Sequence, residues 1–160
     1  VKINMGKPKF EWEQIPLSES MDTKEVSINL LDKEYGHGFC LNVGNPHIIF
    51  FVKDCSKIDI KKLGPKIENY RFFPERANVT FAQVLDKKNI KVNVWERGAG
   101  QTKACGTAAC AVGVAAFKKN LADKNLHVHF KEGYLQINTQ EEIFMTGPVS
   151  EVKKEDIDIE

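Results

Sequence analysis

The sequence predicts an α/β (α+β) domain in which a mostly antiparallel sheet curls around one central, buried helix. Short apolar or alternating runs separated by turn residues occupy most of the chain and are typical of strands. Residues 104–119 break this pattern, because Ala, Val, Gly and Cys predominate and no charge occurs from Cys105 to Phe117. At 160 residues, 42% of them hydrophobic, the chain can bury a real core. We expect one domain over residues 1–150, followed by a terminal segment, residues 151–160.

Seven segments are expected to be strands. Residues 47–52 are continuous enough in apolar character to predict a strand buried on both faces. Residues 79–85 and 90–95 flank Asp86-Lys87-Lys88-Asn89 and predict a hairpin with a four-residue turn. The other expected strands are residues 26–30, 126–130, 134–137 and 143–145.

Two segments predict helices. Ser56 is a suitable N-cap for a helix over residues 57–70, which Gly64-Pro65 must interrupt or kink. Residues 104–119 predict a helix that is apolar on all sides and therefore buried. Lys118 and Lys119 at its end suit the negative end of the helix dipole.

Composition and charge narrow the possible function classes. The 23 Lys and Arg residues nearly balance the 22 Asp and Glu residues, so no global field favours nucleic acid or an anionic membrane. No apolar run approaches the ~20 residues of a membrane span, and no signal-peptide pattern opens the chain. We therefore expect a cytoplasmic protein with no nucleic acid and no membrane as partner. The first residue, Val1, also fits a piece of a longer polypeptide.

Cys105 is the candidate reactive residue. It follows a glycine-rich loop that starts with Glu96-Arg97, and it stands at the expected start of the apolar helix. Unpaired N–H groups and the helix dipole stabilise a thiolate there, so we expect the thiol pKa to fall from its usual value of about 8.5. The N–H groups of Gly106 and Thr107 would form a carboxylate site at the same place.

The remaining cysteines and a histidine pair have simpler interpretations. Cys110 lies inside the apolar helix and is expected to be a core residue, and Cys40 and Cys55 are interpreted as core or incidental. His127 and His129 share one strand face, but no further ligand has suitable spacing. No metal site is therefore expected.

Two more loops directly precede expected strands. In Gly44-Asn45-Pro46-His47, Pro46 restricts Asn45 to an extended conformation, and His47 could tune a neighbouring thiol. In Phe73-Pro74-Glu75-Arg76-Ala77-Asn78, the last residue leads into a strand. Taken alone, each loop is more often just a turn.

Three segments together resemble the C-terminal half of the diaminopimelate epimerase family. They are Asn42-Val43-Gly44-Asn45-Pro46-His47, Phe73-Pro74-Glu75-Arg76-Ala77-Asn78, and Glu96-Arg97-Gly98-Ala99-Gly100 followed by Ala104-Cys105-Gly106-Thr107. Their order and spacing match the family, and the last string is highly specific. Related enzymes such as proline racemase share Cys-Gly-Thr but usually not the residues before it.

The resemblance implies a reaction and a set of roles. Such an enzyme interconverts LL- and meso-diaminopimelate, precursors of lysine and peptidoglycan, with two thiols on opposite faces of the α-carbon and without pyridoxal phosphate, metal or other cofactor. Cys105 would be one thiol, and Glu96 and His47 would help to set the thiol pKa values. The implied substrate contacts are Gly106 and Thr107 to the α-carboxylate, Glu96 and the Arg97 backbone to the α-ammonium, and the Arg97 side chain, Asn45 and Asn78 to the distal end.

One departure from the family pattern matters. The other thiol of the family lies in an N-terminal half within Cys-Gly-Asn, which this sequence lacks; Cys40-Leu41-Asn42 is not that motif. Two-base inversion needs an acid and a base on opposite faces of the substrate. We therefore expect half of an enzyme that is inactive alone, with the N-terminal half as partner, residues 151–160 packing on that half, and a homodimer possible.

Other interpretations stay open. One is a non-catalytic module that binds small amino acids or carboxylates at Gly106 and Thr107, and another is a second kind of two-cysteine racemase with the same fold. A redox sensor built on Cys105 is the third, and it is weakened because no C-x-x-C or obvious resolving cysteine accompanies that residue.

Overall fold

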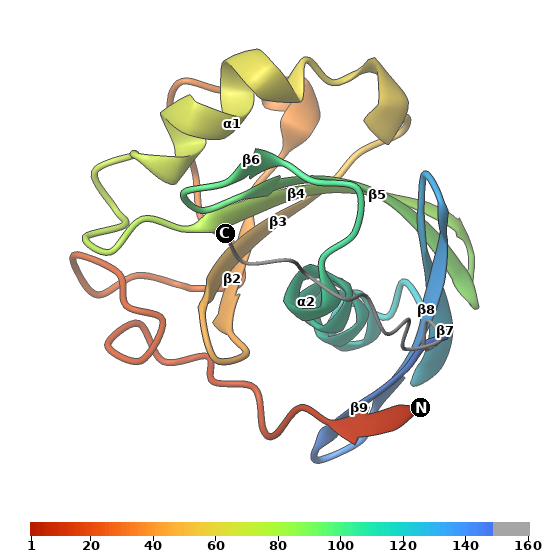
Figure 1. Ribbon diagram of the computed structural model, residues 1–160. Helices are drawn as coiled ribbons and strands as arrows, with labels where there is room; N and C mark the ends of the chain where they lie inside the picture. Colours follow the sequence, from red (N-terminus) through yellow and green to blue (C-terminus); the bar gives the residue numbers. More distant parts are fainter. Residues whose placement is uncertain (149–160) are drawn as a thin grey trace, which may run out of the picture.

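The computed structural model describes residues 1–148, which form one curled sheet with helices inside and outside the curl (Figure 1). The long helix α2 lies inside, and α1 lies against the outer side. In chain order the elements are β1 (Lys2–Asn4), the 3₁₀ helix η1 (Lys33–Tyr35), β2 (Phe39–Asn42), β3 (Pro46–Phe51), the 3₁₀ helix η2 (Cys55–Lys57), α1 (Ile60–Glu68), β4 (Asn78–Asp86), β5 (Asn89–Glu96), β6 (Gly100–Gln101), α2 (Gly106–Lys118), β7 (Asn125–Phe130), β8 (Gly133–Thr139) and β9 (Ile143–Thr146).

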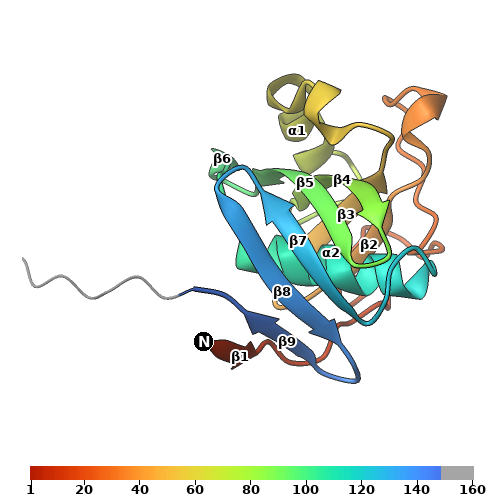
Figure 2. The ribbon, with the colours of Figure 1, turned by 90° about the vertical axis from the view of Figure 1, so that its right-hand side faces the viewer.

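The strand order within the described residues is β1-β9-β8-β7-β5-β4-β3-β2, and β6 pairs with β5 beside this path. The pairs β3–β4 and β5–β7 are parallel, and the other pairs are antiparallel. Figure 1 looks along α2 and shows the strands curling around it, while Figure 2 shows the helix from the side, behind β7 and β8. The expected architecture of a mostly antiparallel sheet around one helix is confirmed.

The sheet has a hydrophobic core on each of its faces. The inner core joins α2 to side chains such as Ile49 of β3, whereas the outer core holds Ile48 and Phe50 of the same strand. All three side chains are fully buried. Because successive strand side chains point to opposite faces, a strand with a core on each side must be apolar throughout. The expected double burial of this strand is confirmed.

The helix α2 is buried along most of its length. Its residues 108–116 are all buried, and the small side chains among them allow the strands to approach closely. At Gly113 an added Cβ atom would lie only 2.8 Å from Cγ2 of Ile137 on β8. The absence of a polar face in the sequence therefore reflects contact with the sheet on all sides.

The structure corrects two expectations about the N-terminal half of the chain. Residues 26–30 do not form a strand, since Val26 makes only an isolated bridge to Gly38 and a turn follows. The first helix begins at Ile60, not after Ser56, because the Asp59 carboxylate accepts a hydrogen bond from the backbone N–H of Lys62 and caps it. Side-chain caps of this kind decide a helix start more directly than propensity does.

The helix α1 also runs without interruption through Gly64-Pro65, so the expected alternative of an interruption is wrong. Proline removes one backbone donor from the helix and needs room for its ring. Gly64 lies against the indole of Trp95, where an added Cβ atom would come within 2.4 Å of Cγ. This glycine is therefore a point of close approach between α1 and β5, not a break in the helix.

The later strands agree with the sequence, and three short strands were not expected. The hairpin β4–β5 and the strands β7, β8 and β9 are confirmed, although the hairpin turn is only Lys87-Lys88. The strands β1, β2 and β6 were missed. The expected segment at residues 151–160 lies outside the described residues.

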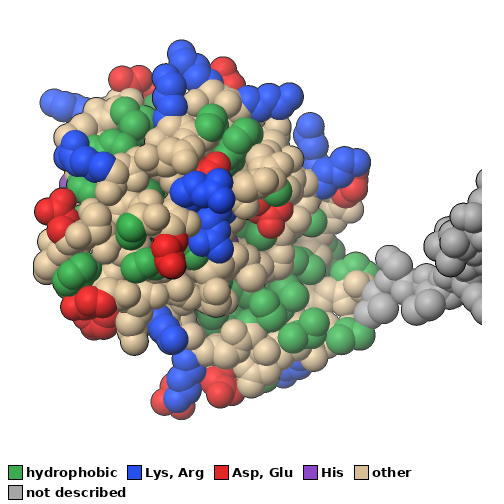
Figure 3. Space-filling model, turned by 60° about the vertical axis from the view of Figure 1, so that its left-hand side comes forward, with side chains coloured by type: hydrophobic (Ala, Val, Ile, Leu, Met, Phe, Trp, Pro, Cys, Tyr) green, Lys and Arg blue, Asp and Glu red, His purple; other side chains and the backbone are tan. Residues whose placement is uncertain are grey.

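The surface in Figure 3 carries lysine and arginine side chains interspersed with aspartate and glutamate, with hydrophobic side chains between them. This mixture agrees with the net charge of +1 for the whole chain. Among residues 1–148, no helix is long and apolar enough to cross a membrane.

Candidate active site

The start of α2 is built around Cys105. This residue is the N-cap of the helix, with an extended backbone at φ −147° and ψ 110°, and its sulfur accepts a hydrogen bond from the backbone N–H of Ala108 at 3.4 Å. The Thr107 hydroxyl oxygen lies 3.5 Å from the same sulfur. Cys105 is 6% exposed, whereas the other three cysteines are 0% exposed. A thiol thus occupies the place where serine or aspartate commonly caps a helix.

The environment of Cys105 raises its thiol pKa, contrary to expectation. Burial is the main cause, and the nearby Glu96 carboxyl adds to it. The hydrogen bonds from Thr107 and the Ala108 N–H act in the opposite direction but do not outweigh burial. The helix N-terminus therefore supplies the expected donors, but removal from water dominates because it disfavours the charged thiolate.

A chain of hydrogen bonds connects Cys105 to the loop before β3. The Asn45 amide donates to the Thr107 hydroxyl at 3.2 Å, and the Asn45 carbonyl oxygen lies 2.8 Å from Nε2 of His47. Since an amide oxygen only accepts, Nε2 of His47 carries the proton in this arrangement. His47 is therefore linked to the thiol by contacts through Asn45 and Thr107.

His47 is an uncharged residue in this fold. It is fully buried, and burial, aided by the positive charge of Arg97, lowers its pKa to about 3. Its Nδ1 atom has no hydrogen-bond partner among residues 1–148. A neutral ring at this position can orient Asn45 but cannot supply a positive charge to stabilise a thiolate.

Glu96 and Arg97 lie at the end of β5, and Asn78 fixes the backbone of Arg97. The Arg97 N–H donates to the Asn78 side-chain oxygen at 2.8 Å, and the Asn78 amide donates to the carbonyl of Pro46 at 3.0 Å. The Arg97 guanidinium donates to the carbonyl of Glu75 at 3.1 Å. The three sequence segments that carry the expected site residues therefore meet in space.

The first turn of α2 offers donors for an anion. Within residues 1–148, the N–H groups of Gly106 and Thr107 have no hydrogen-bond acceptor. An added Cβ atom on Gly106 would lie 3.1 Å from Sδ of Met145, so glycine lets β9 pack closely against the start of α2. Free N–H groups at the positive end of a helix dipole suit a carboxylate.

The residues that were set aside in the sequence form no side-chain hydrogen bond with the expected site residues in the described part of the chain. Cys40, Cys55 and Cys110 are free and fully buried, and burial raises the pKa of Cys110 to about 12. His129 contacts Asn89 and packs with His127 and Tyr134. No group of His, Cys, Asp and Glu within the described part of the chain could hold a metal ion.

Sequence reasoning missed Glu68, which lies behind the loop that carries Glu96 and Arg97. Its buried carboxylate accepts hydrogen bonds from three groups, one of them the backbone N–H of Gly98. Nothing in the local sequence distinguishes it from the other charged residues of the first helix. Its partners come from two later segments, the loop at Arg76 and residues 95–98, so only the fold reveals them.

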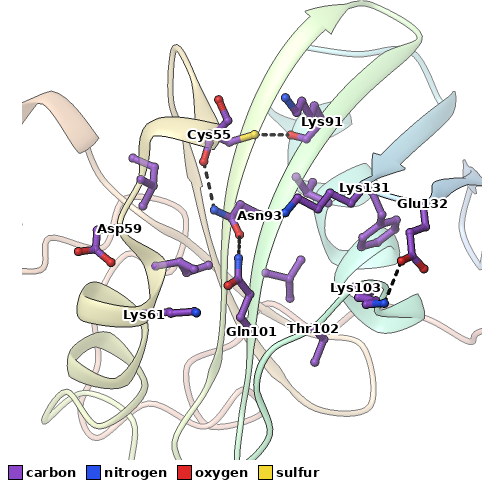
Figure 4. A pocket seen from close by; sticks show the side chains of 16 residues that line it. Cys55, Asp59, Lys61, Lys91, Asn93, Gln101, Thr102, Lys103, Lys131 and Glu132 are labelled. Atoms are coloured by element: carbon purple, nitrogen blue, oxygen red, sulfur yellow. Dashed lines mark hydrogen bonds and ion pairs between the residues drawn. The ribbon is translucent and has the colours of Figure 1, made fainter.

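A separate pocket of about 530 Å³ lies between the start of α1, β5 and the β7–β8 turn (Figure 4). An ion pair between Lys103 and Glu132, 3.0 Å long, lies at one side, and Asn93 links Cys55 to Gln101 through hydrogen bonds. None of the expected site residues lines this pocket. It is distinct from the site at Cys105.

Comparisons with known proteins identify one family. The family profile described as diaminopimelate epimerase matches residues 39–152. The diaminopimelate epimerase of Pelagibacter ubique is 51% identical over 96% of this chain and 58% of its own length. That of Erythrobacter litoralis is 41% identical over 94% of the chain and 56% of its own length. The chain thus spans about half the length of the curated relatives it matches.

A solved structure shows the same fold at low sequence identity. A protein from Pseudomonas aeruginosa, described as a predicted epimerase, aligns with a TM-score of 0.55 and 15% identity. The alignment covers 90% of this chain and 53% of that protein. At this identity the likeness concerns the fold alone.

Proposed function

Because this chain belongs to the diaminopimelate epimerase family, we propose that it forms one half of a diaminopimelate epimerase in which Cys105 is one of two proton-transferring thiols. The substrate would be LL- or meso-diaminopimelate, which places the enzyme in lysine biosynthesis. The observation that carries the proposal is the position of Cys105, whose sulfur caps α2 beside two free N–H groups.

The proposed reaction transfers one proton to the substrate and one from it. A thiolate on one face removes the α-proton and becomes a thiol, leaving the electron pair on the α-carbon. The thiol on the other face then gives its proton to that carbon and becomes a thiolate. The configuration inverts, and no electrons leave the substrate. General acid–base catalysis of this kind requires both sulfurs within reach of the same carbon.

The surroundings of Cys105 favour the acid role in the resting site. Burial and the Glu96 carboxyl raise the thiol pKa, so at neutral pH the sulfur holds its proton. When the proton leaves, the Thr107 hydroxyl and the Ala108 N–H can donate to the thiolate. These donors are in place before the reaction, and such preorganisation stabilises charge that develops in the transition state.

The polar groups around Cys105 would hold the amino acid. The N–H groups of Gly106 and Thr107 would receive the α-carboxylate, and Glu96 with the Arg97 backbone would receive the α-ammonium. Asn45, Asn78 and the Arg97 side chain would face the distal end. In the structure Asn45 donates to the Thr107 hydroxyl, Asn78 accepts from the Arg97 backbone N–H, and the Arg97 side chain donates to the Glu75 carbonyl. These bonds fix the three groups in place, so their spacing can select the substrate length.

The opposing thiol would come from an N-terminal half of the enzyme. The relatives of this chain are longer, and the chain matches 58% of one and 56% of another. A second half would add the acid or base for the other face and would exclude water from the site. The chain by itself would therefore fold and bind substrate weakly, but would not epimerise it.

The test is reconstitution. The chain would be mixed with a separately produced N-terminal half of the Pelagibacter ubique relative, without cofactor, and incubated with LL-diaminopimelate in deuterated water. We expect deuterium at the α-carbon and formation of the meso isomer only in the mixture. Cys105→Ala should abolish both, and Cys110→Ala, a thiol change in the same helix, should not. Turnover by the chain alone, or by the Cys105→Ala mixture, would overturn the proposal.

A further inference from the structure

Glu68 is a buried carboxylate outside the residues assigned to the proposed reaction. It is the last residue of α1 and is 5% exposed. One carboxylate oxygen accepts from Nε1 of Trp95 at 2.9 Å. The other accepts from Nη1 of Arg76 and from the backbone N–H of Gly98, each at 3.0 Å. Two later segments of the chain, the loop at Arg76 and residues 95–98, therefore converge on this one group.

The position is unfavourable for an isolated carboxylate. The C-terminal end of a helix carries partial negative charge, so an acidic side chain there is destabilising. Burial of a carboxylate adds a cost unless the group is paired and hydrogen-bonded. The hydrogen bonds from Trp95, Arg76 and Gly98 offset these two costs. A hydrophobic residue could pack at this place, so the carboxylate indicates a role for the bonds themselves.

Two of the three partners have backbone conformations that are rare for side-chain-bearing residues. Gly98 has φ +75°, and Arg76 has φ +62°. The left-handed conformation of Arg76 is strained, and such strain persists only where the surrounding structure holds the residue in place. The bonds to Glu68 hold both residues, and an added Cβ atom on Gly98 would lie 3.8 Å from the Arg76 guanidinium.

The hydrogen bond from Gly98 to Glu68 is one of three backbone hydrogen bonds that hold a single turn in place. The N–H of Arg97 donates to Asn78, that of Gly98 donates to Glu68, and that of Ala99 donates to the Glu96 carbonyl at 3.1 Å. Three successive backbone donors are therefore satisfied, two of them by side chains of β4 and α1. This turn, Glu96–Ala99, follows directly from β5 and carries the two residues proposed to face the α-ammonium.

We propose that Glu68 is a positioning residue of the active site, which holds the turn Glu96–Ala99 so that Glu96 and Arg97 face Cys105 and the substrate. The inference rests on the proposed function for the roles of Glu96 and Arg97. Glu68 acts through Gly98 and does not touch the substrate. Its α1 neighbour Gly64, which lies against Trp95, lets the helix approach closely enough for this contact.

The variant Glu68→Leu tests this role with little change in side-chain size. A leucine side chain accepts no hydrogen bond, so Trp95, Arg76 and Gly98 all lose their acceptor. Glu13→Leu is the control, because Glu13 is exposed and the same change removes the same charge.

The first readout is amide hydrogen exchange in the chain itself, which does not depend on the proposed function. We expect the Gly98 amide to exchange at least tenfold faster in Glu68→Leu, as the loss of about 1.4 kcal/mol of protection requires. The amide of Ile49, in a buried strand, should keep its exchange rate. Unchanged exchange at Gly98, or an equal increase at both amides, would overturn the inference, because the effect would then be absent or global.

The second readout is epimerisation by the chain mixed with the N-terminal half. Glu68→Leu should lower kcat/KM by roughly 10- to 100-fold, as expected when reactive groups are misplaced, and Glu13→Leu should not change it. If the wild-type mixture epimerises and Glu68→Leu does so equally well, the inference is wrong and the proposed function stands. If the wild-type mixture is inactive, the proposed function fails, and exchange at Gly98 still decides whether Glu68 holds the turn.

Discussion

The Asn45 side-chain amide donates a hydrogen bond of 3.2 Å to the hydroxyl of Thr107, 62 residues further along the chain. Because the Thr107 oxygen accepts this bond, its own proton is free to point toward the Cys105 sulfur, 3.5 Å away. The loop before β3 thereby orients a donor at the start of α2. Residues far apart in the sequence thus determine how well a thiolate at Cys105 is stabilised.

Removal of the Thr107 hydroxyl should make the Cys105 thiolate harder to form. Thr107→Val keeps the shape but loses the donor that lowers the thiol pKa, so the pKa should rise further. We expect the alkylation of Cys105 by iodoacetamide near pH 8 to slow roughly threefold to tenfold, the value of a hydrogen bond of ~1 kcal/mol. Thr107→Ser, which keeps the hydroxyl, is the control; equal slowing in both variants would contradict the assignment of the donor.

Cys105 should be the most reactive of the four cysteines, as its position at the helix start predicts. It is the least buried thiol, and it has two hydrogen-bond donors near its sulfur. Because its pKa is raised, labelling should accelerate as the pH increases above the usual thiol range. Mass spectrometry after brief alkylation of the folded chain would locate the label. Preferential labelling of Cys40 or Cys55 would show that the prediction is wrong.

Acidification should destabilise the fold through His47. Its pKa falls from 6.5 to about 3 on folding, so between these values the unfolded chain binds a proton that the folded chain does not. Stability is therefore lost as the pH falls through this window, by about 2 kcal/mol at pH 5 relative to pH 8. Urea unfolding of the wild type and of His47→Gln at both pH values would measure the difference. Equal losses in the two proteins would mean that His47 does not titrate in this way.

Gly113→Ala should destabilise the protein although alanine favours helices. The new Cβ atom would lie 2.8 Å from Cγ2 of Ile137 and 3.3 Å from Cγ2 of Thr139, both on β8. Overpacking typically costs 1–3 kcal/mol, against a gain of about 1 kcal/mol in helix propensity. Because Cβ atoms do not normally come as close as 2.8 Å to another carbon, we expect a cost of about 2–3 kcal/mol and thus a net loss of about 1–2 kcal/mol in the free energy of unfolding by denaturant. An unchanged or raised stability would show that β8 can move away from α2.

Patterns over neighbouring residues were sufficient to predict the regular part of the fold. The alternation in β4 and β5 and the continuous apolar run of β3 were correct, because the side-chain direction in a strand depends on local backbone geometry. The short strands β2 and β6 were missed. They are only four and two residues long, so their own sequences carry little periodic signal.

The candidate site likewise contains residues that the sequence predicted and one residue that only the fold revealed. Cys105, Glu96 and Asn78 stand in strings specific enough to be recognised, and the fold brings their segments together. Glu68 could not be predicted, because its importance comes from bonds to Trp95, Arg76 and Gly98. In the sequence alone, a buried acidic residue cannot be distinguished from a solvated one.

The sequence by itself determined that Cys105 begins a helix without a polar face, and hence that donors and a thiol meet at one point. Only the tertiary structure decided the protonation of the groups there. Burial in the curled sheet raises the Cys105 pKa against the pull of the helix end, and it keeps His47 neutral. The reason is physical: helix donors are local to the sequence, whereas the exclusion of water depends on every strand that closes around α2.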